Sequence, residues 1–189
     1  MLIIYAHPNK EGHCGYILKK IQRELDNDKK NYEILNLYKI NFNPILKNEE
    51  HYTSGRRKVT EKIGEFQDKI RNNKKFIIIY PTWWNSTPAI LKGFFDRVLT
   101  MGFAFKYENK IPRGLLQGKV AVITTTGGPI IFEKFFAGNR SLKTVINDTL
   151  NFCGLKSKGF MIGSARELTE KQKDKIDKKI KRLFYYLKK

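Results

Sequence analysis

Residues 76–97 read FIIIYPTWWNSTPAILKGFFDR, and this stretch decides the fold of the chain. The run 76–80 is apolar and rich in isoleucine, which is typical of a strand buried on both faces in a parallel sheet. Pro81 cannot donate a ladder hydrogen bond, so it ends the strand. Pro88 suits the beginning of a helix, and the apolar residues that follow it recur at helical spacing. The stretch therefore predicts a strand, a short turn and a helix.

The turn between strand and helix carries two adjacent tryptophans, Trp83 and Trp84, followed by Asn85. In an open α/β sheet, ligands bind at the carboxyl ends of the strands, where this turn lies. The tryptophans have two interpretations. In the first, they cover the core or make a dimer contact. In the second, they form a wall for a flat ring.

The composition indicates one globular domain over residues 1–189, in a cytoplasmic setting. No apolar run is long enough to span a membrane, and the N-terminal residues do not resemble a signal peptide. The two cysteines, Cys14 and Cys153, have no metal-binding spacing and suggest a reducing compartment. We therefore expect no metal site and no integral membrane segment.

The formal net charge of +19 is unusual and would suit nucleic acid, an anionic membrane or anionic cofactors. The lysines are scattered through every segment, however, and are not gathered into one stripe with interleaved aromatics. Abundant Asn, Ile and Lys are also what AT-rich coding produces. We therefore expect no nucleic-acid partner.

Two further strands end in polar, glycine-bearing loops. The first strand, over residues 2–6, leads into a loop with His7, Gly12, His13 and Cys14, and a helix follows. The first turn of a helix presents unpaired amide protons, so this arrangement suits a phosphate. His7 either contacts the ligand or simply bonds the loop backbone.

The second of these strands, over residues 120–124, ends in Thr125, Thr126, Gly127 and Gly128. Small residues just past a strand end let the backbone approach a ligand closely. An ordinary tight turn is the alternative.

The other segments complete a doubly wound sheet with the expected strand order 2-1-3-4-5. They are, in chain order, a strand over 32–37, a wrapping or lid loop over 38–55, a helix over about 57–72, a helix through Leu142 and Leu150, a strand over 159–162 and a last amphipathic helix with a lysine-rich side. That basic side is interpreted as a solvated face.

In this strand order, the loops after the first, third and fourth strands meet in one crevice. They bring together a phosphate-binding helix end, a tryptophan turn and a Thr-Gly-Gly backbone. A phosphate at one end and a flat ring at the other describe a flavin nucleotide.

These residues resemble the flavodoxin-like NAD(P)H:quinone oxidoreductases, a family that includes DT-diaphorase and the bacterial modulators of drug activity. The matching motifs extend from residue 3 to about residue 163. They include Ala6-His7-Pro8, Tyr80-Pro81-Thr82-Trp83-Trp84, the block Pro88-Ala-Ile-Leu-Lys-Gly-Phe-Phe-Asp-Arg-Val, Gly102-Phe-Ala-Phe-Lys-Tyr and Thr125-Thr-Gly-Gly.

The resemblance implies a flavodoxin-like three-layer sandwich that binds FMN or FAD and uses NAD(P)H as co-substrate. It implies a two-electron ping-pong reaction with quinones or similar small aromatic acceptors. It also implies a homodimer whose active site is built from both subunits. The chain is short and has no obvious adenosine-binding extension, which favours FMN over FAD.

Carried over by motif, the resemblance assigns three groups of cofactor-binding residues and a substrate slot, with no conventional catalytic acid–base pair. The flavin phosphate would be held by His7, Gly12, His13 and Cys14, the ring by Pro81, Thr82, Trp83, Trp84 and Asn85, and the pyrimidine edge by Thr125, Thr126, Gly127 and Gly128. Trp84, Phe105 and Tyr107 would line the slot, with Phe105 and Tyr107 reaching into the partner's pocket.

The sequence departs from the family pattern at two places. Gly12 stands where the family usually has a serine, and Glu133 and Asn139 fall near the positions of the family's charge-stabilising tyrosine and histidine. Two other functions share this fold: a flavin-binding regulatory or ancillary subunit of a membrane transport system, and a flavodoxin-type electron carrier. A flavodoxin usually has a Thr/Ser-rich phosphate loop and an acidic surface, which this chain lacks.

Overall fold

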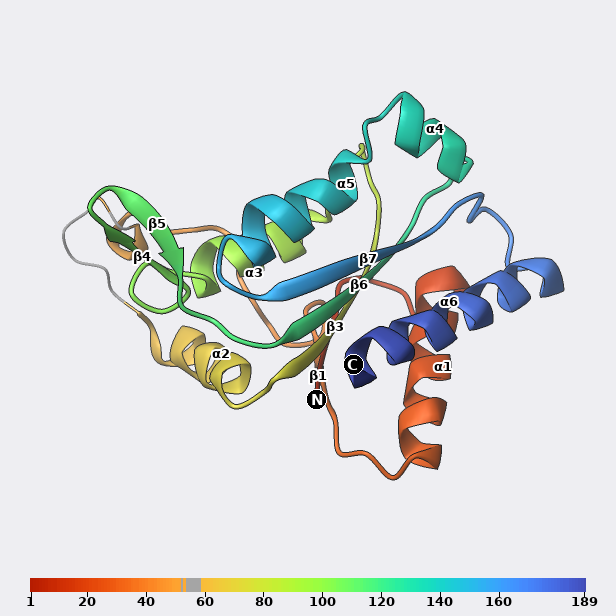
Figure 1. The fold of residues 1–189 in the computed structure, drawn as a ribbon, viewed down its shortest axis with the longest axis horizontal. Coiled ribbons are helices and arrows are strands. Elements are labelled where there is room, and N and C mark those ends of the chain that lie inside the picture. Colours follow the sequence, from red (N-terminus) through yellow and green to blue (C-terminus); the bar gives the residue numbers. More distant parts are fainter. Residues whose placement is uncertain (52, 54–58) are drawn as a thin grey trace.

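The computed structural model describes residues 1–51, 53 and 59–189. Its centre is a five-stranded sheet in which every neighbouring pair of strands is parallel (Figure 1). The spatial order is β2-β1-β3-β6-β7. The bounds are Leu2–Tyr5 (β1), Glu33–Asn36 (β2), Lys75–Pro81 (β3), Lys119–Thr125 (β6) and Lys156–Ile162 (β7).

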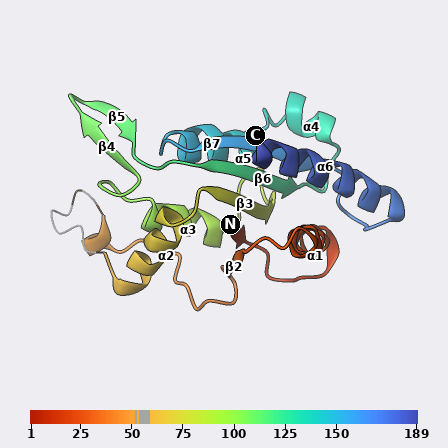
Figure 2. The ribbon, with the colours of Figure 1, turned by 60° about the horizontal axis from the view of Figure 1, so that its bottom comes forward.

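The predicted order 2-1-3-4-5 is confirmed only in part, because the sequence prediction counted five strands. A separate antiparallel hairpin, β4 (Phe105–Glu108) and β5 (Ile111–Gly114), stands between β3 and β6 in the chain. The last two places in the sheet therefore belong to β6 and β7. Figure 2 shows the hairpin projecting at the upper left, on the far side of the molecule from α1 (Gly12–Asn27).

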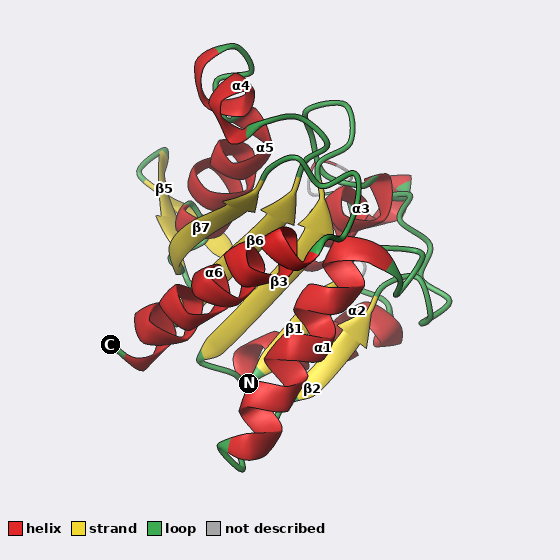
Figure 3. Ribbon diagram, turned by 90° about the vertical axis from the view of Figure 1, so that its right-hand side faces the viewer, coloured by secondary structure: helices red, strands yellow, loops and turns green. Residues whose placement is uncertain are grey.

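Helices cover both faces of the sheet. On one face, α1 packs beside α6 (Glu170–Lys188), and Figure 3 shows both lying in front of the strands. The other helices of the described residues are α2 (Glu61–Arg71), α3 (Ala89–Val98), α4 (Ile130–Phe135), α5 (Arg140–Lys143), the π-helical η3 (Thr144–Asn151) and the 3-10 turn η1 (Asn48–Glu50). All four residues of β1 are buried, as predicted for a strand covered on both faces.

Alternate residues of each strand enter two separate apolar cores. Ile77 and Ile79 of β3 pack with the apolar faces of α1 and α6. Phe76 and Ile78 of the same strand pack with α2, α3 and η3. Because successive side chains of a strand point to opposite faces, each strand supplies apolar residues to both faces of the sheet. Helices pack on both faces, which produces the predicted three-layer sandwich.

The prediction of a helix over about residues 57–72 needs a correction at its beginning. Residue 57 lies outside the described residues, and α2 begins at Glu61, with Thr60 in the N-cap position. Val59 precedes the helix and is 46% exposed, so it does not belong to the buried face. The buried face is formed by Ile63, Phe66, Gln67 and Ile70.

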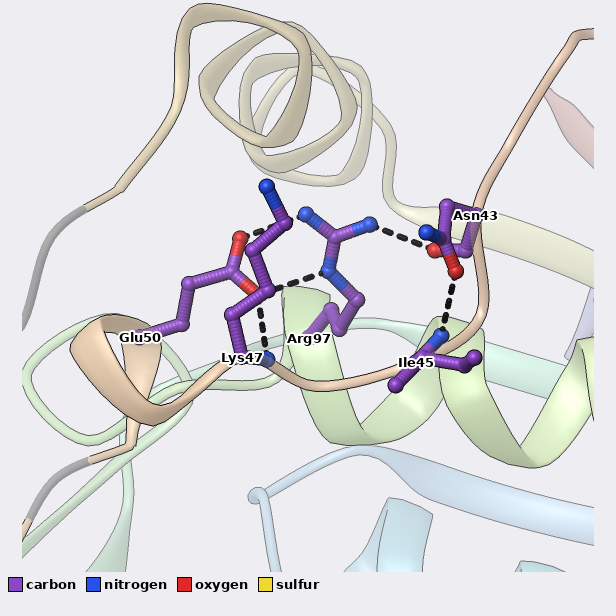
Figure 4. Close-up of polar contacts among 5 residues, drawn as sticks. All are labelled: Asn43, Ile45, Lys47, Glu50 and Arg97. Carbon is purple, nitrogen blue, oxygen red and sulfur yellow. Dashed lines mark hydrogen bonds and ion pairs between the residues drawn. The ribbon is translucent and has the colours of Figure 1, made fainter.

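The predicted wrapping loop is fixed to α3, at least over residues 38–51, which we call the strap. Gly93 of α3 makes this contact possible, because a Cβ atom there would lie 2.2 Å from the carbonyl oxygen of Pro44. One helical turn later, Arg97 donates to the backbone carbonyl of Asn43 and to both carboxylate oxygens of Glu50 (Figure 4). Residues 52, 54 and 55 of the predicted loop lie outside the described residues.

The ion pair between Arg97 and Glu50 is almost completely buried, with side-chain exposures of 8% and 4%. Burial alone would raise the pKa of Glu50. The hydrogen bonds from Arg97 and from the amide of Lys47, together with the two positive charges, nevertheless lower this pKa below its usual value. The described part of the strap is therefore a structural clamp rather than a lid.

Among the described residues, no helix combines the length and apolar character needed to cross a bilayer.

Candidate functional site

The three predicted ligand loops meet at the carboxyl edge of the sheet. The amide of Thr82, after β3, donates to the carbonyl of Thr125, at the end of β6, over 2.7 Å. The thiol of Cys14 lies 3.4 Å from the hydroxyl of Thr125. The ring of His7 lies 5.9 Å from the ring of Trp83. These contacts join the loops after β1, β3 and β6 into one continuous surface.

His7 stabilises its own loop. Its Nδ1 atom lies 2.6 Å from the carbonyl oxygen of Asn9, and the Tyr5 hydroxyl donates to the same oxygen over 2.8 Å. The loop is further closed by the side chain of Asn9, which accepts the amide of Glu11. The loop-bonding interpretation of His7 is therefore supported, and a contact with a ligand remains a prediction.

The beginning of α1 has the features of an anion site. Gly12 starts the helix with φ +74°, a conformation that glycine adopts without strain, and a Cβ there would meet only open space. Among the described residues, no side chain caps this end and the first turn holds no acidic residue. The amide protons of the first turn and the positive end of the helix dipole thus remain available.

His13 and Cys14 face inward. Burial lowers the pKa of His13, so its imidazole is neutral at pH 7 and offers a phosphate no positive charge. The Nε2 atom of His13 is buried and has no hydrogen-bond partner among the described residues. Burial also raises the pKa of the Cys14 thiol, to about 11, although the hydrogen bond with Thr125 opposes this. The Cys14 side chain is buried against Thr125, which leaves its backbone amide as the group that a ligand could contact.

The tryptophan turn is a tight two-residue turn. Trp83 and Ser86 exchange backbone hydrogen bonds of 3.0 and 2.9 Å, and the two residues between them have φ values of 49° and 56°. This is the geometry of a type I′ turn. Trp84, at the tip of this turn, is 100% exposed. Within one chain, Trp84 therefore covers no core, so the core-covering interpretation is wrong for this residue, while the dimer contact and the wall for a flat ring stay predictions.

Asn85 joins this turn to the segment after β6. Its side-chain amide donates to the carbonyl of Ala137 over 3.3 Å. The side-chain oxygen of Asn85, Oδ1, is buried and has no hydrogen-bond partner in the described part of the chain.

The side chain of Glu133 lies beside the Thr-Gly-Gly turn. Thr126 donates its hydroxyl to Oε1 of Glu133 over 2.7 Å, whereas Oε2 of Glu133 is buried without a partner among the described residues. A Cβ at Gly127 or Gly128 would meet nothing within 4 Å, so the space in front of both glycines is open. Asn139 plays a different part, because it caps α5 with φ +57° and donates its amide to the carbonyl of Glu133.

A cavity of about 530 Å³ lies between the tryptophan turn and α4. Its lining residues are Asn85, Gly128, Pro129, Phe132, Glu133, Phe136 and Ala137. Two of them carry the unpartnered oxygen atoms, so a ligand that supplies N–H or O–H donors would satisfy both. A flavin fits this test, since its flat ring suits aromatic walls and its pyrimidine edge carries an N–H donor.

The aromatic residues of α4 are site features that the sequence prediction missed. Phe132 and Phe136 stack with ring centroids 4.8 Å apart, and Phe135 and Phe136 are each 77% exposed. The signal was present in the sequence, because three phenylalanines follow the Thr-Gly-Gly-Pro turn within seven residues of it.

Phe105 and Tyr107 do not lie at this edge, so one chain does not assemble the predicted slot. Phe105 packs on Phe152, just before the amino end of β7, with ring centroids 5.0 Å apart. The seven residues of β6 separate that end from the ligand loops, which corresponds to roughly 20 Å. Figure 1 accordingly shows the hairpin at the left and α4 at the upper right. Trp84 and Tyr107 therefore do not belong to one exposed patch, and Phe103 and Phe105 are only partly exposed.

Comparisons with known proteins agree with this geometry. The family model described as "Flavodoxin-like fold" matches residues 1–185. An uncharacterized NAD(P)H oxidoreductase of Haemophilus influenzae is 38% identical over 84% of this chain and 80% of its own length. Human ribosyldihydronicotinamide dehydrogenase [quinone] is 32% identical over 93% of this chain and 85% of its own length.

Among solved structures, the NAD(P)H:quinone oxidoreductase of Methanothermobacter marburgensis superposes with a TM-score of 0.84. It is 25% identical, and the match covers 96% of this chain and 94% of that protein. The chain is therefore an oxidoreductase that belongs to the flavodoxin-like family of NAD(P)H:quinone oxidoreductases.

Proposed function

We propose that this protein is a flavin-dependent NAD(P)H oxidoreductase that passes two electrons to quinones or similar aromatic acceptors by a ping-pong mechanism. The observation that carries the proposal is the cavity beside Gly128, where two unpartnered oxygen atoms and aromatic walls lie at the same sheet edge as an uncapped helix end. The names of the relatives support the reaction class. We also propose a cytoplasmic location, in keeping with the two unbridged cysteines.

Each loop would hold one part of the cofactor. The amides at the beginning of α1, from Gly12 onward, would hold the phosphate, and the neutral His13 would add a hydrogen bond through Nε2. Residues 81–85 would hold the ring, and residues 125–128 its pyrimidine edge. A bound flavin would supply the two-electron chemistry, since its ring accepts a hydride from NAD(P)H and delivers it to the acceptor.

The protein's own contribution is orientation and charge stabilisation. The backbone amides of Gly127 and Gly128 would donate to the edge where negative charge develops, whereas the amide of Thr126 already donates to the carbonyl of Ile162. Fixed donors of this kind are effective in a site that excludes water. Glu133, rather than Asn139, has an unpartnered oxygen beside this turn, which supports a role for Glu133 in holding an N–H group of the ring. Holding both substrates in turn in one aromatic slot supplies the orientation.

We further propose that the working unit is a homodimer. Trp84 lies free at one end of the sheet and Tyr107, which is 54% exposed, projects from a hairpin at the other end. A two-fold dimer can place the hairpin of one subunit over the ligand loops of its partner, since such an interface is self-complementary. This arrangement would complete the slot of Trp84, Phe105 and Tyr107. FMN is favoured over FAD, and the excess of lysine favours NADPH over NADH.

Replacing Gly128 with valine is expected to weaken flavin binding about tenfold while leaving the fold intact. The valine side chain would enter the open space that the ring needs, and overfilling a site costs at least about 1 kcal/mol. The matched control is Gly64→Val on α2, which also faces open space but lines no part of this cavity. Fluorescence titration of the apoprotein with FMN measures both affinities. Equal affinities for the two variants would remove Gly128 from the site.

The function itself is tested by rapid denaturation and by turnover. We expect the mass of the released flavin to be that of FMN, with about one flavin per chain, as for a cofactor held in one pocket. We also expect NADH or NADPH oxidation to depend on added quinone. A protein that takes up neither FMN nor FAD would refute the proposal. A flavoprotein that turns over little but is retained on membranes would indicate an ancillary subunit instead.

A further inference from the structure

A second cavity, of about 490 Å³, lies on the other side of α4, between this helix, the carboxyl end of β7 and α6. Its floor is apolar and consists of Ile130 and Ile131 from α4 and Met161 and Ile162 from β7. This volume lies within the range of pockets that hold small organic molecules.

One wall of this cavity is formed by four basic residues, which present mainly their aliphatic stems to it, and three of them, Lys175, Lys178 and Arg182, are exposed to solvent. Lys175, Lys178, Lys179 and Arg182 line it at the spacing i, i+3, i+4 and i+7, so they form one stripe along α6. None of the four has an ion-pair partner among the described residues, and the lining includes no aspartate or glutamate. The neighbouring side of the helix differs, because there Asp177 pairs with Lys20 of α1.

The charges in this wall repel one another. Burial lowers the pKa of Lys179, and the positive charges of Arg182 and of Lys134 on α4 lower it further. The lysine-rich side of the last helix is solvated at Lys175, Lys178 and Arg182, as interpreted from sequence, and this stripe also borders the cavity, where Lys179 is partly buried.

We propose that this cavity binds an organic anion with an apolar body, such as a carboxylate or sulfonate on an aromatic or aliphatic framework. The apolar floor would take the body, and the unpaired cations of α6 would take the charge, since an uncompensated cationic cluster above an apolar surface favours a ligand that satisfies both. A small inorganic anion would leave the floor uncovered, and an apolar molecule would leave the cations unpaired.

This site is separate from the proposed flavin site. Ile130 and Ile131 of α4 face the basic cavity, whereas Phe132 and Glu133 face the other one. Only Pro129, at the beginning of α4, lines both. A ligand in the basic cavity would thus be bound at the same time as the cofactor.

The test uses the flavin-saturated protein and two fluorescent probes, anilinonaphthalene sulfonate and phenylnaphthylamine, which has the same rings without the sulfonate. We expect the sulfonate to bind at a single saturable site and the neutral probe to bind at least several-fold more weakly. The double variant Lys178→Gln/Arg182→Gln should weaken sulfonate binding about tenfold, because it removes two charge-assisted contacts. The control double variant Lys171→Gln/Lys181→Gln removes the same net charge from exposed positions of the same helix, outside the cavity.

Several outcomes would overturn the proposal. Equal weakening by the two double variants would indicate attraction to the overall charge, and displacement of the probe by excess FMN would place it in the cofactor site. Equal affinity of the two probes would mean that the cations play no part. Retention on anionic lipid vesicles that depends on Lys178 and Arg182, without binding of the soluble sulfonate, would assign this surface to a membrane instead.

Discussion

Replacing Arg97 with alanine is expected to lower the free energy of unfolding by about 3–5 kcal/mol, the usual cost of leaving a buried charge without its partner. Arg97 is the only residue of α3 for which the structure records hydrogen bonds to the strap, where it holds the carbonyl of Asn43 and both oxygens of Glu50 (Figure 4). Without the guanidinium, Glu50 would keep only the amide of Lys47 as a recorded donor. Urea unfolding followed by circular dichroism measures the loss.

The matched control for Arg97→Ala is Lys92→Ala on the same helix. Lys92 pairs with Asp96 on the exposed side of α3, so its removal should cost less than about 1 kcal/mol. A loss in Arg97→Ala no larger than in this control would show that the strap is held by its apolar contacts alone. Flavin content should change little in either variant, because the clamp lies on α3 and the strap and does not line the cavity of about 530 Å³.

The same ion pair gives a dependence on pH. The pKa of Glu50 is lowered in the folded protein, so its stabilising contribution is complete above the unfolded value, 4.5, and is lost as the pH falls through the lower folded value. Glu50→Gln removes this titration. The wild-type protein should therefore lose stability relative to Glu50→Gln as the pH falls below about 4.5, which thermal melts at a series of pH values would detect.

The sheet and the three ligand loops were predictable because the sequence marks them locally. Runs of isoleucine and valine indicate strands buried on both faces, and Pro81, Gly12 and Gly127 mark the loop segments that follow these strands. The order of parallel strands then follows from the handedness of the crossover connections. Neither step needs any knowledge of which distant side chains touch.

The hairpin of β4 and β5 was missed because its turn lacks the residue pair that usually marks such a turn. Asn109 and Lys110 both have positive φ, 51° and 66°, as in a type I′ turn. The usual marker of this turn is Asn-Gly, and lysine in the second place removes the signal. Ile111–Gly114 is also exposed along its whole length, so it shows no alternation of apolar and polar residues.

Helix α4 was missed for a related reason. It has only six residues, none of them buried, so no periodic apolar face distinguishes it from a loop. The pairing of Arg97 with Glu50, 47 residues apart, depends on the path of the strap, which local patterns do not specify. The sequence therefore did not predict the exposed elements or the long-range side-chain pairing.

The Trp84→Ala variant is expected to lower kcat/KM roughly tenfold to a hundredfold in both half-reactions while retaining its flavin. Trp84 touches no core within its own chain, since its side chain is fully exposed. The melting temperature of the chain should therefore not fall. The turn that carries it is held by the backbone bonds between Trp83 and Ser86, which the substitution leaves in place. Stopped-flow reduction by NADPH and reoxidation by a quinone measure the two half-reactions separately.

Tyr185→Ala serves as the control for Trp84→Ala, because Tyr185 is an exposed aromatic of α6 that does not line the cavity beside Gly128. It should leave both half-reactions unchanged. Unchanged rates in Trp84→Ala as well would remove the indole from the substrate slot. A large loss of flavin in Trp84→Ala would instead assign the indole to the cofactor.

Mixing two variants of lowered activity tests whether the slot is shared between subunits. If Trp84 of one subunit works with Tyr107 of its partner, a heterodimer of Trp84→Ala and Tyr107→Ala chains has one site with both changes and one with neither. Random reassociation should then restore activity in about one quarter of all sites, since half of the dimers are mixed and half of their sites are intact. If both residues served the same chain's site, every site in the mixture would carry one change. Activity that stays at the level of the separate variants after subunit exchange, verified by native mass spectrometry, would therefore exclude the shared slot.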